Sequence, residues 1–250
     1  MKTFGTNDWI VLNHIIYRIH SMDNLDQMRS ILLEQLRSLI RYDSADFFLA
    51  SEDGKGELVH PVFYNADAEL GSRYMKNFFD IDYSKGLLQS GKSIIYRETD
   101  LMPEEQRVQS QYYKSYFLPE GWHYGLDMLI ADHQRLLGVV TLYRKKGEPD
   151  FEYEDIFILE LLMEHLEFRL LREAREKADS GLTVEQCAFR YQLTKREETI
   201  LSLLLLSESN ESICEKLCIT NNTLKKHILN LYRKLQINSR SQLLKLFRGN

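Results

Sequence analysis

Apolar residues recur every three or four positions through the last quarter of the chain, which is the spacing of amphipathic helices. Residues that cap helix starts precede these runs: Thr194 stands three positions before Glu197, and Ser239 stands three positions before Gln242. The pattern predicts an all-α segment with four helices, at 195–207, 210–217, 221–235 and 240–247.

The link between the second and third of these helices is very short, since it comprises only Cys218 to Thr220. Two helices joined by so tight a turn form a helix-turn-helix, whose second helix enters the major groove of DNA. That second helix has an apolar stripe on one face and cationic residues elsewhere. The stripe consists of Leu224, Ile228, Leu231 and Leu235.

Upstream of residue 180, runs of strand length lie between helical patterns. The predicted elements are helices at 7–20 and 24–40, strands at 45–51, 57–64, 92–97, 126–132 and 136–144, and a long helix at 152–178. The last two strands are close enough to form an antiparallel hairpin. The sequence then breaks at Ser180 and Gly181. We therefore expect an α+β domain, an antiparallel sheet covered by helices on one face, before the helical segment.

Composition and charge support two domains with different tasks. The chain has 250 residues and 44% apolar content, which suits two domains, and no run is long enough to span a membrane. The start lacks the layout of a signal peptide, so we expect a cytoplasmic protein. Residues 1–180 contain 21 Lys and Arg against 31 Asp and Glu, whereas residues 181–250 contain 11 against 6. The basic end indicates a polyanionic partner, unless it is only a solvated face.

The basic segment resembles the LuxR/FixJ-type (GerE-like) DNA-binding domain over residues 193–240. The matching positions are Leu193, Thr194, Arg196, Glu197, Leu201, Ser209, Asn210, Ile213, Leu217, Ile219, Thr223, Lys225, His227, Asn230, Lys234, Leu235 and Arg240. Four positions depart from the family pattern. The family has glycine where Ser207 and Gln236 stand, at helix ends that favour a left-handed residue, and Cys214 and Ser212 replace a small alanine and an acidic residue.

The resemblance implies a transcriptional regulator that binds double-stranded DNA through the 221–235 helix. Near its start, Asn222, Lys225 and Lys226 are the candidates for reading base edges. The remaining expected DNA-binding residues are better placed for phosphates or for the helix start: Thr220, Thr223, His227, Arg233 and Lys234. His227 has a packed core histidine as its alternative. We expect Leu229 to pack in the core, with contact to a thymine methyl group as the alternative.

Residues 7 to about 172 resemble a GAF domain, most closely at residues 136–162. The resemblance implies a small-molecule sensor, although the cyclic-nucleotide signature of the family is missing and no cysteine precedes Cys187 to attach a bilin. We therefore assign 1–171 to a GAF-like sensor and dimerisation domain, 172–192 to a helical linker, and 193–250 to the helix-turn-helix domain.

A ligand of the sensor domain would lie in its aromatic-rich middle. Eleven aromatic residues fall within the 51 residues from Tyr74 to Tyr124, where they line either a pocket or a solid aromatic core. The candidate ligand-binding residues are Tyr74, Phe78, Tyr96, Tyr113, Phe117 and Trp122. The spacing of His60, His123 and His133 matches no haem or metal site, so we expect no cofactor and no metal.

Other functional classes fit the sequence less well. No glycine-rich phosphate loop, nucleophile elbow or metal-ligand spacing is present, so we expect no enzyme. The C-terminal pair of strands disagrees with a phosphoacceptor receiver domain. An acyl-homoserine-lactone receptor is the main alternative, although Glu69, Arg73 and Tyr83 stand where its pocket pattern requires other residues. The first domain could also serve dimerisation or partner binding alone. Cys214 and Cys218 are expected to be small buried side chains.

We expect the protein to be a homodimer, because the long helix carries two apolar stripes. The first stripe contains Ile156, Leu159, Met163, Leu166 and Leu170, and the second contains Phe157, Leu161, Phe168 and Leu171. One stripe can cover the sheet and the other a partner helix, together with a stripe of the first helix made of Trp9, Leu12, Ile16 and Ile19. The alternative is a long helix buried wholly within its own domain.

Overall fold

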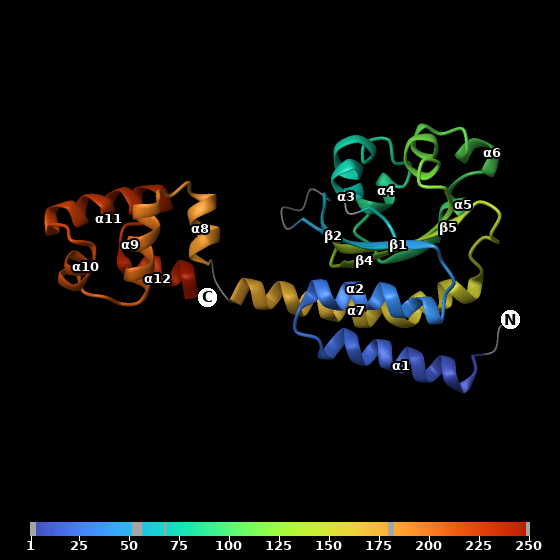
Figure 1. Cartoon of the computed structure of the whole chain (residues 1–250), viewed down its shortest axis with the longest axis horizontal. Coiled ribbons are helices and arrows are strands. Elements are labelled where there is room, and N and C mark those ends of the chain that lie inside the picture. Colours follow the sequence, from blue (N-terminus) through green and yellow to red (C-terminus); the bar gives the residue numbers. More distant parts are fainter. Residues whose placement is uncertain (1–3, 52–56, 68, 180–182, 249–250) are drawn as a thin grey trace. The chain divides into compact units, whose positions relative to one another are not determined.

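The chain divides into two compact units, Met1–Arg172 and Glu173–Asn250 (Figure 1). The computed structural model describes residues 4–51, 57–67, 69–179 and 183–248. The predicted sequence break at Ser180 and Gly181 lies outside the described residues.

Unit 1 is built on a five-stranded sheet with the order β2-β1-β5-β4-β3, in which all neighbouring strands run antiparallel. The strands are β1 (Ser44–Ala50), β2 (Leu58–Tyr64), β3 (Ile94–Arg97), β4 (Trp122–Asp132) and β5 (Arg135–Lys145). His133 and Gln134 connect β4 to β5 with φ angles of 45° and 66°, as a two-residue hairpin turn requires. The predicted strands and the predicted fold class are thus confirmed, with β4 beginning earlier than expected.

Three long helices lie on one side of the sheet: α1 (Thr6–Ser21), α2 (Leu25–Gln35) and α7 (Tyr153–Asp179), and the 3₁₀ turn η1 (Leu36–Ser38) follows α2. Of these, α2 and α7 lie next to the sheet, and α1 packs on their outer side (Figure 1). Their apolar residues form one core with the sheet, and Leu33, Leu162 and Leu166 are fully buried in it. The second predicted helix was too long, because α2 ends at Gln35.

The expected stripes of the two dimerisation helices are used mainly inside unit 1. Leu166 of the first α7 stripe is fully buried, and Leu12 and Ile19 of α1 are 3% and 1% exposed. The prediction that the α1 stripe faces a partner helix was therefore wrong for these residues. On the second α7 stripe, however, Phe157 and Phe168 remain 36% and 59% exposed.

The opposite face of the sheet carries short helical segments, so the expectation that helices cover one face was incomplete. These segments are α3 (Leu70–Arg73), η2 (Tyr74–Phe78), α4 (Lys85–Leu88), α5 (Glu98–Leu101), α6 (Glu104–Arg107) and η3 (Tyr113–Phe117). Both η2 and η3 are π-helical turns, a local widening that often marks functional sites. A second, aromatic-rich core lies beneath them.

Unit 2 is helical throughout its described residues. Its helices are α8 (Val184–Arg190), α9 (Lys195–Leu205), α10 (Asn210–Leu217), α11 (Asn221–Leu235) and α12 (Arg240–Arg248). Leucine and isoleucine side chains from α9 to α12 meet in one core. Cys187 of α8 is fully buried in the same core, so this part of the predicted linker packs with the C-terminal helices.

Candidate DNA-binding helix and a buried acidic cavity

The turn between α10 and α11 is held by backbone hydrogen bonds and by one arginine. Cys218 adopts a left-handed conformation with φ 52°, and the Ile219 N–H donates to the Cys214 carbonyl at 3.0 Å. Arg196 of α9 donates to the Leu217 carbonyl at 2.9 Å. These contacts fix the direction in which α11 leaves the turn. Cys218 is exposed, so the expectation that it is buried was wrong, and Cys214 is half-buried.

The outward face of α11 is formed by residues at helical spacing. Asn222, Lys225, Lys226, Leu229 and Arg233 are all exposed. Neither Lys225 nor Lys226 forms an ion pair with any residue that the structure describes. Leu229 is 69% exposed, which contradicts the expectation of core packing. The face therefore presents an amide, two ammonium groups, a guanidinium group and an exposed apolar side chain.

Three other predicted DNA-binding residues lie around the start of α11. Thr220 is the N-cap residue, and its hydroxyl accepts from the Thr223 N–H at 3.3 Å. Thr223 and His227 are half-buried along the next turns. The remaining backbone N–H groups of the first turn point out of the helix start, as phosphate binding requires.

Lys234 has a different environment from the other cationic residues of α11. Its ammonium donates to the Glu197 carboxylate at 2.7 Å and to the Gln192 carbonyl at 3.0 Å. Glu197 also accepts from the Thr194 N–H at 2.8 Å, so its carboxylate joins the start of α9 to the end of α11. The geometry therefore gives Lys234 an internal structural contact.

A row of polar residues crosses the middle of the sheet in unit 1. Tyr96 of β3 pairs with Asp127 of β4, Asp127 pairs with Thr141 of β5, and Thr141 pairs with Asp46 of β1. Paired residues in an antiparallel sheet point to the same face, so these four side chains lie in line. They border a cavity of about 20 Å³ on the face opposite α2 and α7.

The two aspartates of this row are hydrogen-bonded differently. The Tyr143 hydroxyl donates to Asp46 Oδ2 at 2.8 Å, and Thr141 Oγ1 donates to Asp127 Oδ1 at 2.9 Å. Asp127 Oδ2 is buried and has no hydrogen-bond partner among the described residues. A buried acceptor without a donor is rare in folded proteins and calls for an explanation.

Two further buried carboxyl groups line the cavity from the side of the short helices. Asp82 accepts from the Tyr74 hydroxyl at 2.6 Å and from both the N–H and the hydroxyl of Ser84 at 2.7 Å. Glu98 accepts from the Tyr83 hydroxyl. Both acids are almost fully removed from solvent, with 6% and 2% exposure.

Burial controls the protonation of all four acids. Loss of hydration raises the pKa of Asp46 to about 7, although hydrogen bonds from Tyr143 and Thr141 oppose the rise. Burial likewise raises the pKa of Asp82. It raises the pKa of Glu98 and Asp127 well above the usual range, and the negative charges of neighbouring acids add to the effect.

The structure separates the predicted ligand-binding aromatic residues into two groups. Tyr74 and Tyr96 line the cavity. Tyr113, Phe117 and Trp122 are buried in the aromatic core, and Phe78 packs against it, so these four support the cavity wall without bordering it. Sequence reasoning missed the polar residues of the cavity and three more of its tyrosines: Asp46, Asp82, Ser84, Glu98, Asp127, Thr141, Tyr112, Tyr116 and Tyr143.

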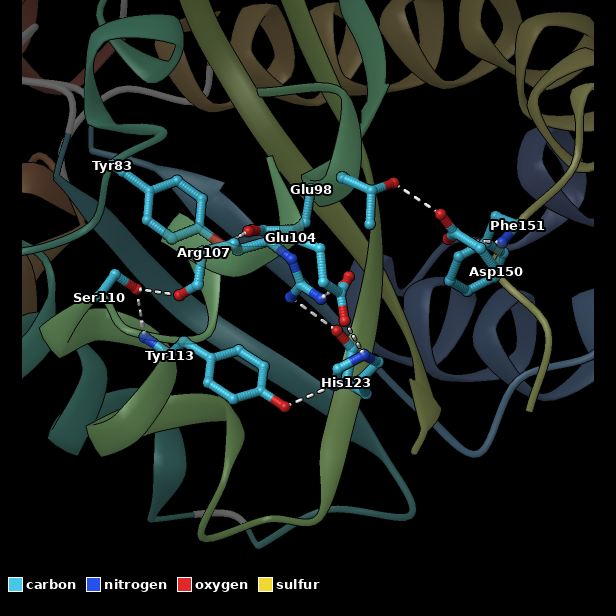
Figure 2. A network of polar contacts seen from close by, with 10 residues as sticks. Tyr83, Glu98, Glu104, Arg107, Ser110, Tyr113, His123, Asp150 and Phe151 are labelled. Atoms are coloured by element: carbon cyan, nitrogen blue, oxygen red, sulfur yellow. Dashed lines mark hydrogen bonds and ion pairs between the residues drawn. The ribbon is translucent and has the colours of Figure 1, made fainter. Parts of the chain in front are cut away.

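A polar network braces the wall next to Glu98 (Figure 2). The buried Arg107 of α6 donates to the His123 carbonyl at 2.7 Å. The two ring nitrogens of His123 lie 2.8 Å from a Glu104 carboxylate oxygen and 2.5 Å from the Tyr113 hydroxyl. The network thus joins α6, η3 and the first residues of β4. His123, for which the sequence predicted no role, therefore has a structural one in this network.

Comparison with known proteins identifies unit 2. Residues 191–247 match the family described as bacterial regulatory proteins, luxR family. This match covers the predicted helix-turn-helix segment and no part of unit 1. Among curated proteins, the CsgBAC operon transcriptional regulatory protein of Escherichia coli is 36% identical over 73 residues, covering 27% of this chain and 34% of the relative. The transcriptional regulatory protein LiaR of Bacillus subtilis is 33% identical over 97 residues, covering 39% of this chain and 38% of the relative. The chain thus spans little more than a third of the length of these relatives.

The two glycine positions of the luxR-family pattern keep their backbone conformation here without glycine. Ser207 and Gln236 have φ angles of 62° and 55°, so both residues are left-handed as a helix end of this kind requires. Arg240 supports the first of these turns by donating to the Leu204 and Glu208 carbonyls at 2.8 and 2.9 Å. Ser207 and Gln236 therefore adopt the left-handed conformation at a higher steric cost than glycine would.

Unit 1 has a fold shared with GAF domains. The GAF domain of a phosphoenolpyruvate-protein phosphotransferase from Acinetobacter superposes with a TM-score of 0.50 at 13% identity, covering 69% of this chain and 97% of that domain. At this identity the likeness concerns the fold alone. Within the described residues, no helix is long and apolar enough to cross a membrane.

Proposed function

We propose that the protein is a one-component transcriptional regulator, which binds operator DNA through α11 and senses a small molecule in unit 1. The observation that carries this proposal is the exposed basic face of α11 within a luxR-family domain. A recognition helix with free cationic side chains near its start is suited to the major groove. The two curated relatives are transcriptional regulatory proteins by name, which supports the same function.

The contacts of α11 suggest a division of labour on DNA. Asn222, Lys225 and Lys226 read base edges, because they are exposed on the face nearest the helix start. Thr220 and Thr223 present the helix N-terminus to a phosphate, and His227 and Arg233 contact the backbone further along. Lys234 is the exception: its ion pair with Glu197 assigns it to holding α11 on α9.

Homodimerisation fits the apolar surface of unit 1. Trp9, Ile10 and Tyr17 of α1 are 46%, 61% and 67% exposed, and Phe168 of α7 is 59% exposed. Ile10 and Tyr17 border the same surface hollow of α1, and contiguous exposed apolar residues are typical of surfaces that bind another protein chain. A dimer would present two copies of α11 to half-sites about one turn of DNA apart.

The sensing part of the proposal rests on the buried cavity of unit 1. Its polar lining and unpaired carboxylate oxygen favour a ligand site over a purely dimerising domain. An acyl-homoserine-lactone receptor has the same general organisation and remains the second candidate. The protein would act in the cytoplasm, without catalytic activity or a resident cofactor.

Selection of bound sequences tests the regulator function. The full chain is incubated with a random pool of DNA duplexes, and bound duplexes are amplified and sequenced over several rounds. We expect an enriched motif, and the Lys225→Ala variant should change the preferred base at one position of each half-site. An unenriched pool would contradict the proposal.

A further inference from the structure

The cavity of unit 1 has a chemistry that specifies the charge of its ligand. We infer that it binds a compact organic cation bearing ammonium or guanidinium groups; this inference rests on the proposed sensing function and names its ligand class. Three features of the cavity favour this ligand class: its acids, the unpaired oxygen of Asp127 and its aromatic walls.

The polar lining of the cavity consists of acids and hydroxyl groups. Asp46, Asp82, Glu98 and Asp127 contribute four carboxyl groups, and no lysine, arginine or histidine lies among the lining residues. Once ionised, four buried acids repel an anion and offer only hydrogen-bond acceptors. A ligand that supplies N–H donors and positive charge would offset both the lost hydration and the mutual repulsion of these acids.

Asp127 supplies an independent indication of a ligand. Asp127 is only 6% exposed. Its Oδ1 accepts a hydrogen bond from Thr141, but its Oδ2 has no hydrogen-bond partner among the described residues. Leaving such an acceptor unpaired is costly, and a charged N–H donor gives the strongest hydrogen bond to it. Because Oδ2 belongs to a residue that lines the cavity, the missing donor can come from a bound molecule.

Metal ions are the simplest cations, and the side chains do not converge on one. Among the described residues, no three His, Cys, Asp or Glu side chains are grouped as metal ligands would be. The acids are instead spread across the sheet and the short helices, with tyrosine rings between them. The rings of Tyr112 and Tyr116 stack with their centroids 5.2 Å apart, and the ring centroids of Tyr74 and Tyr116 are 5.3 Å apart. Aromatic faces next to carboxylates suit an organic cation, which gains cation–π attraction as well as hydrogen bonds.

The size of the cavity implies that the ligand displaces its walls. A volume of about 20 Å³ holds little more than one water molecule. Tyr74 begins η2 and Tyr116 lies in η3, so the cavity is bounded by both π-helical turns. Widened turns can return to regular helix and move the attached side chains, and binding would then favour the open form of the wall.

The charge of the cavity also separates this ligand class from acyl-homoserine lactones. Such a lactone is neutral and offers one amide N–H donor together with several carbonyl acceptors. Its carbonyl oxygens would lie against ionised carboxyl groups, and its single amide N–H could pair with Asp127 Oδ2 but would bring no positive charge. A cation with several N–H groups supplies both the donor and the charge.

A panel of small compounds that differ in charge tests the inference on the full chain. Calorimetry and thermal unfolding are measured with 10 mM 1,4-diaminobutane or guanidinium, and with the neutral 1,4-butanediol and the anionic succinate, at constant ionic strength. We expect binding and stabilisation with at least one of the two cations and with neither control compound. Asp127→Asn should weaken cation binding at least tenfold. Glu105→Gln, which removes an exposed acid of α6, should leave it unchanged.

The outcomes separate this inference from the proposed function. Binding of the diol or of succinate in preference to the cations would overturn the cation class while leaving small-molecule sensing intact. No binding by either cation would also overturn it, and so would equal cation binding by Asp127→Asn. DNA binding is recorded on the same samples, so a failure of the regulator function is visible separately.

Discussion

Asp46 and Asp127 face the same residue, Thr141, from the two strands that flank β5. Two carboxyl groups thus lie two strands apart, roughly 10 Å by the usual spacing of strands, in the middle of a sheet. Both residues are buried. A packed sheet has no structural need for such a pair, and apolar residues of similar size would be more stable there. We therefore regard the acids as functional and expect them to cost stability.

The pH dependence of stability tests that cost. A carboxyl group whose pKa is raised on folding contributes stability that is fully present below its unfolded pKa and is lost as the pH rises through the folded value. For Asp46, the loss extends from about 3.8 to about 7, and Glu98 and Asp127 extend it further. Unit 1 should therefore unfold at a lower temperature at pH 8 than at pH 5.

Substitution of Asp46 tests whether the ionisation of this residue causes the loss of stability at high pH. Asp46→Asn keeps an acceptor for the Tyr143 hydroxyl and removes the ionisation, so it should raise stability at pH 8 by about 1 kcal/mol or more and flatten the pH profile. Thermal unfolding followed by tryptophan fluorescence reports on this unit, because both tryptophans, Trp9 and Trp122, lie in it. Glu105→Gln is the matched control on an exposed acid. A profile unchanged by Asp46→Asn would refute the assignment.

Periodicity was sufficient to predict the strands and most of the longer helices, but it missed the short helical segments between β2 and β4. Its failures have physical causes. The α9 to α11 helices have side-chain caps at Thr194, Ser209 and Thr220, which mark their starts in the sequence. The second helix was extended too far because its apolar spacing continues through η1, where the backbone tightens. Neither π-helical turn has a residue pattern that separates it from ordinary helix.

The cavity was only partly predictable. The density of aromatic residues indicated Tyr74 and Tyr96, but it could not separate lining residues from those behind them. A better signal was present in the strands. Asp46 and Asp127 each interrupt a run of apolar residues that must be buried. Their meeting through Thr141 depends on the order β1-β5-β4, which local sequence does not specify.

Lys234 provides a test of its assigned structural role. Lys234→Met keeps most of the side-chain length and leaves the Glu197 carboxylate without its ion partner, which should destabilise unit 2 by about 1 to 3 kcal/mol. Hydrogen exchange of the α9 and α11 amides measures this. Arg233→Ala, on the exposed face, should leave exchange unchanged and weaken DNA binding. If Lys234→Met left the exchange of both helices unchanged, the contact with Glu197 would be unimportant.

The left-handed residue at the end of α11 offers a stabilising substitution. Gln236 has φ 55°, a conformation that glycine adopts without the steric cost of a Cβ atom. Gln236→Gly should therefore stabilise unit 2 by about 1 kcal/mol in urea unfolding followed by circular dichroism. Gln242→Gly, at the start of α12, should destabilise it by at least this amount, because it also removes the hydrogen bond that Gln242 Oε1 accepts from the Asn238 N–H. Destabilisation by both substitutions would show that the Gln236 side chain has a stabilising contact.

Dimerisation is tested on the exposed residues of α1 and α7. Ile10→Glu combined with Phe168→Glu should give a folded monomer with weakened operator binding, because these side chains are 61% and 59% exposed. Leu166→Glu is the contrasting change, and it should unfold unit 1 because Leu166 is fully buried. Sedimentation velocity at micromolar concentration gives the oligomeric state. An unmodified protein that is monomeric both free and on DNA would exclude the dimer.

If α11 reads operator DNA through its exposed lysines, the affinity must depend on salt and must differ between operator and random DNA when one of these lysines is removed. The affinity of the full chain for a selected operator and for a random duplex is measured by fluorescence anisotropy between 50 and 300 mM salt. We predict a steep linear fall of log K with log salt, whose slope reflects the number of phosphate contacts. Lys226→Ala should cost about 1 to 3 kcal/mol on the operator and much less on the random duplex. Binding that is independent of salt, or equal losses on both duplexes, would contradict the account.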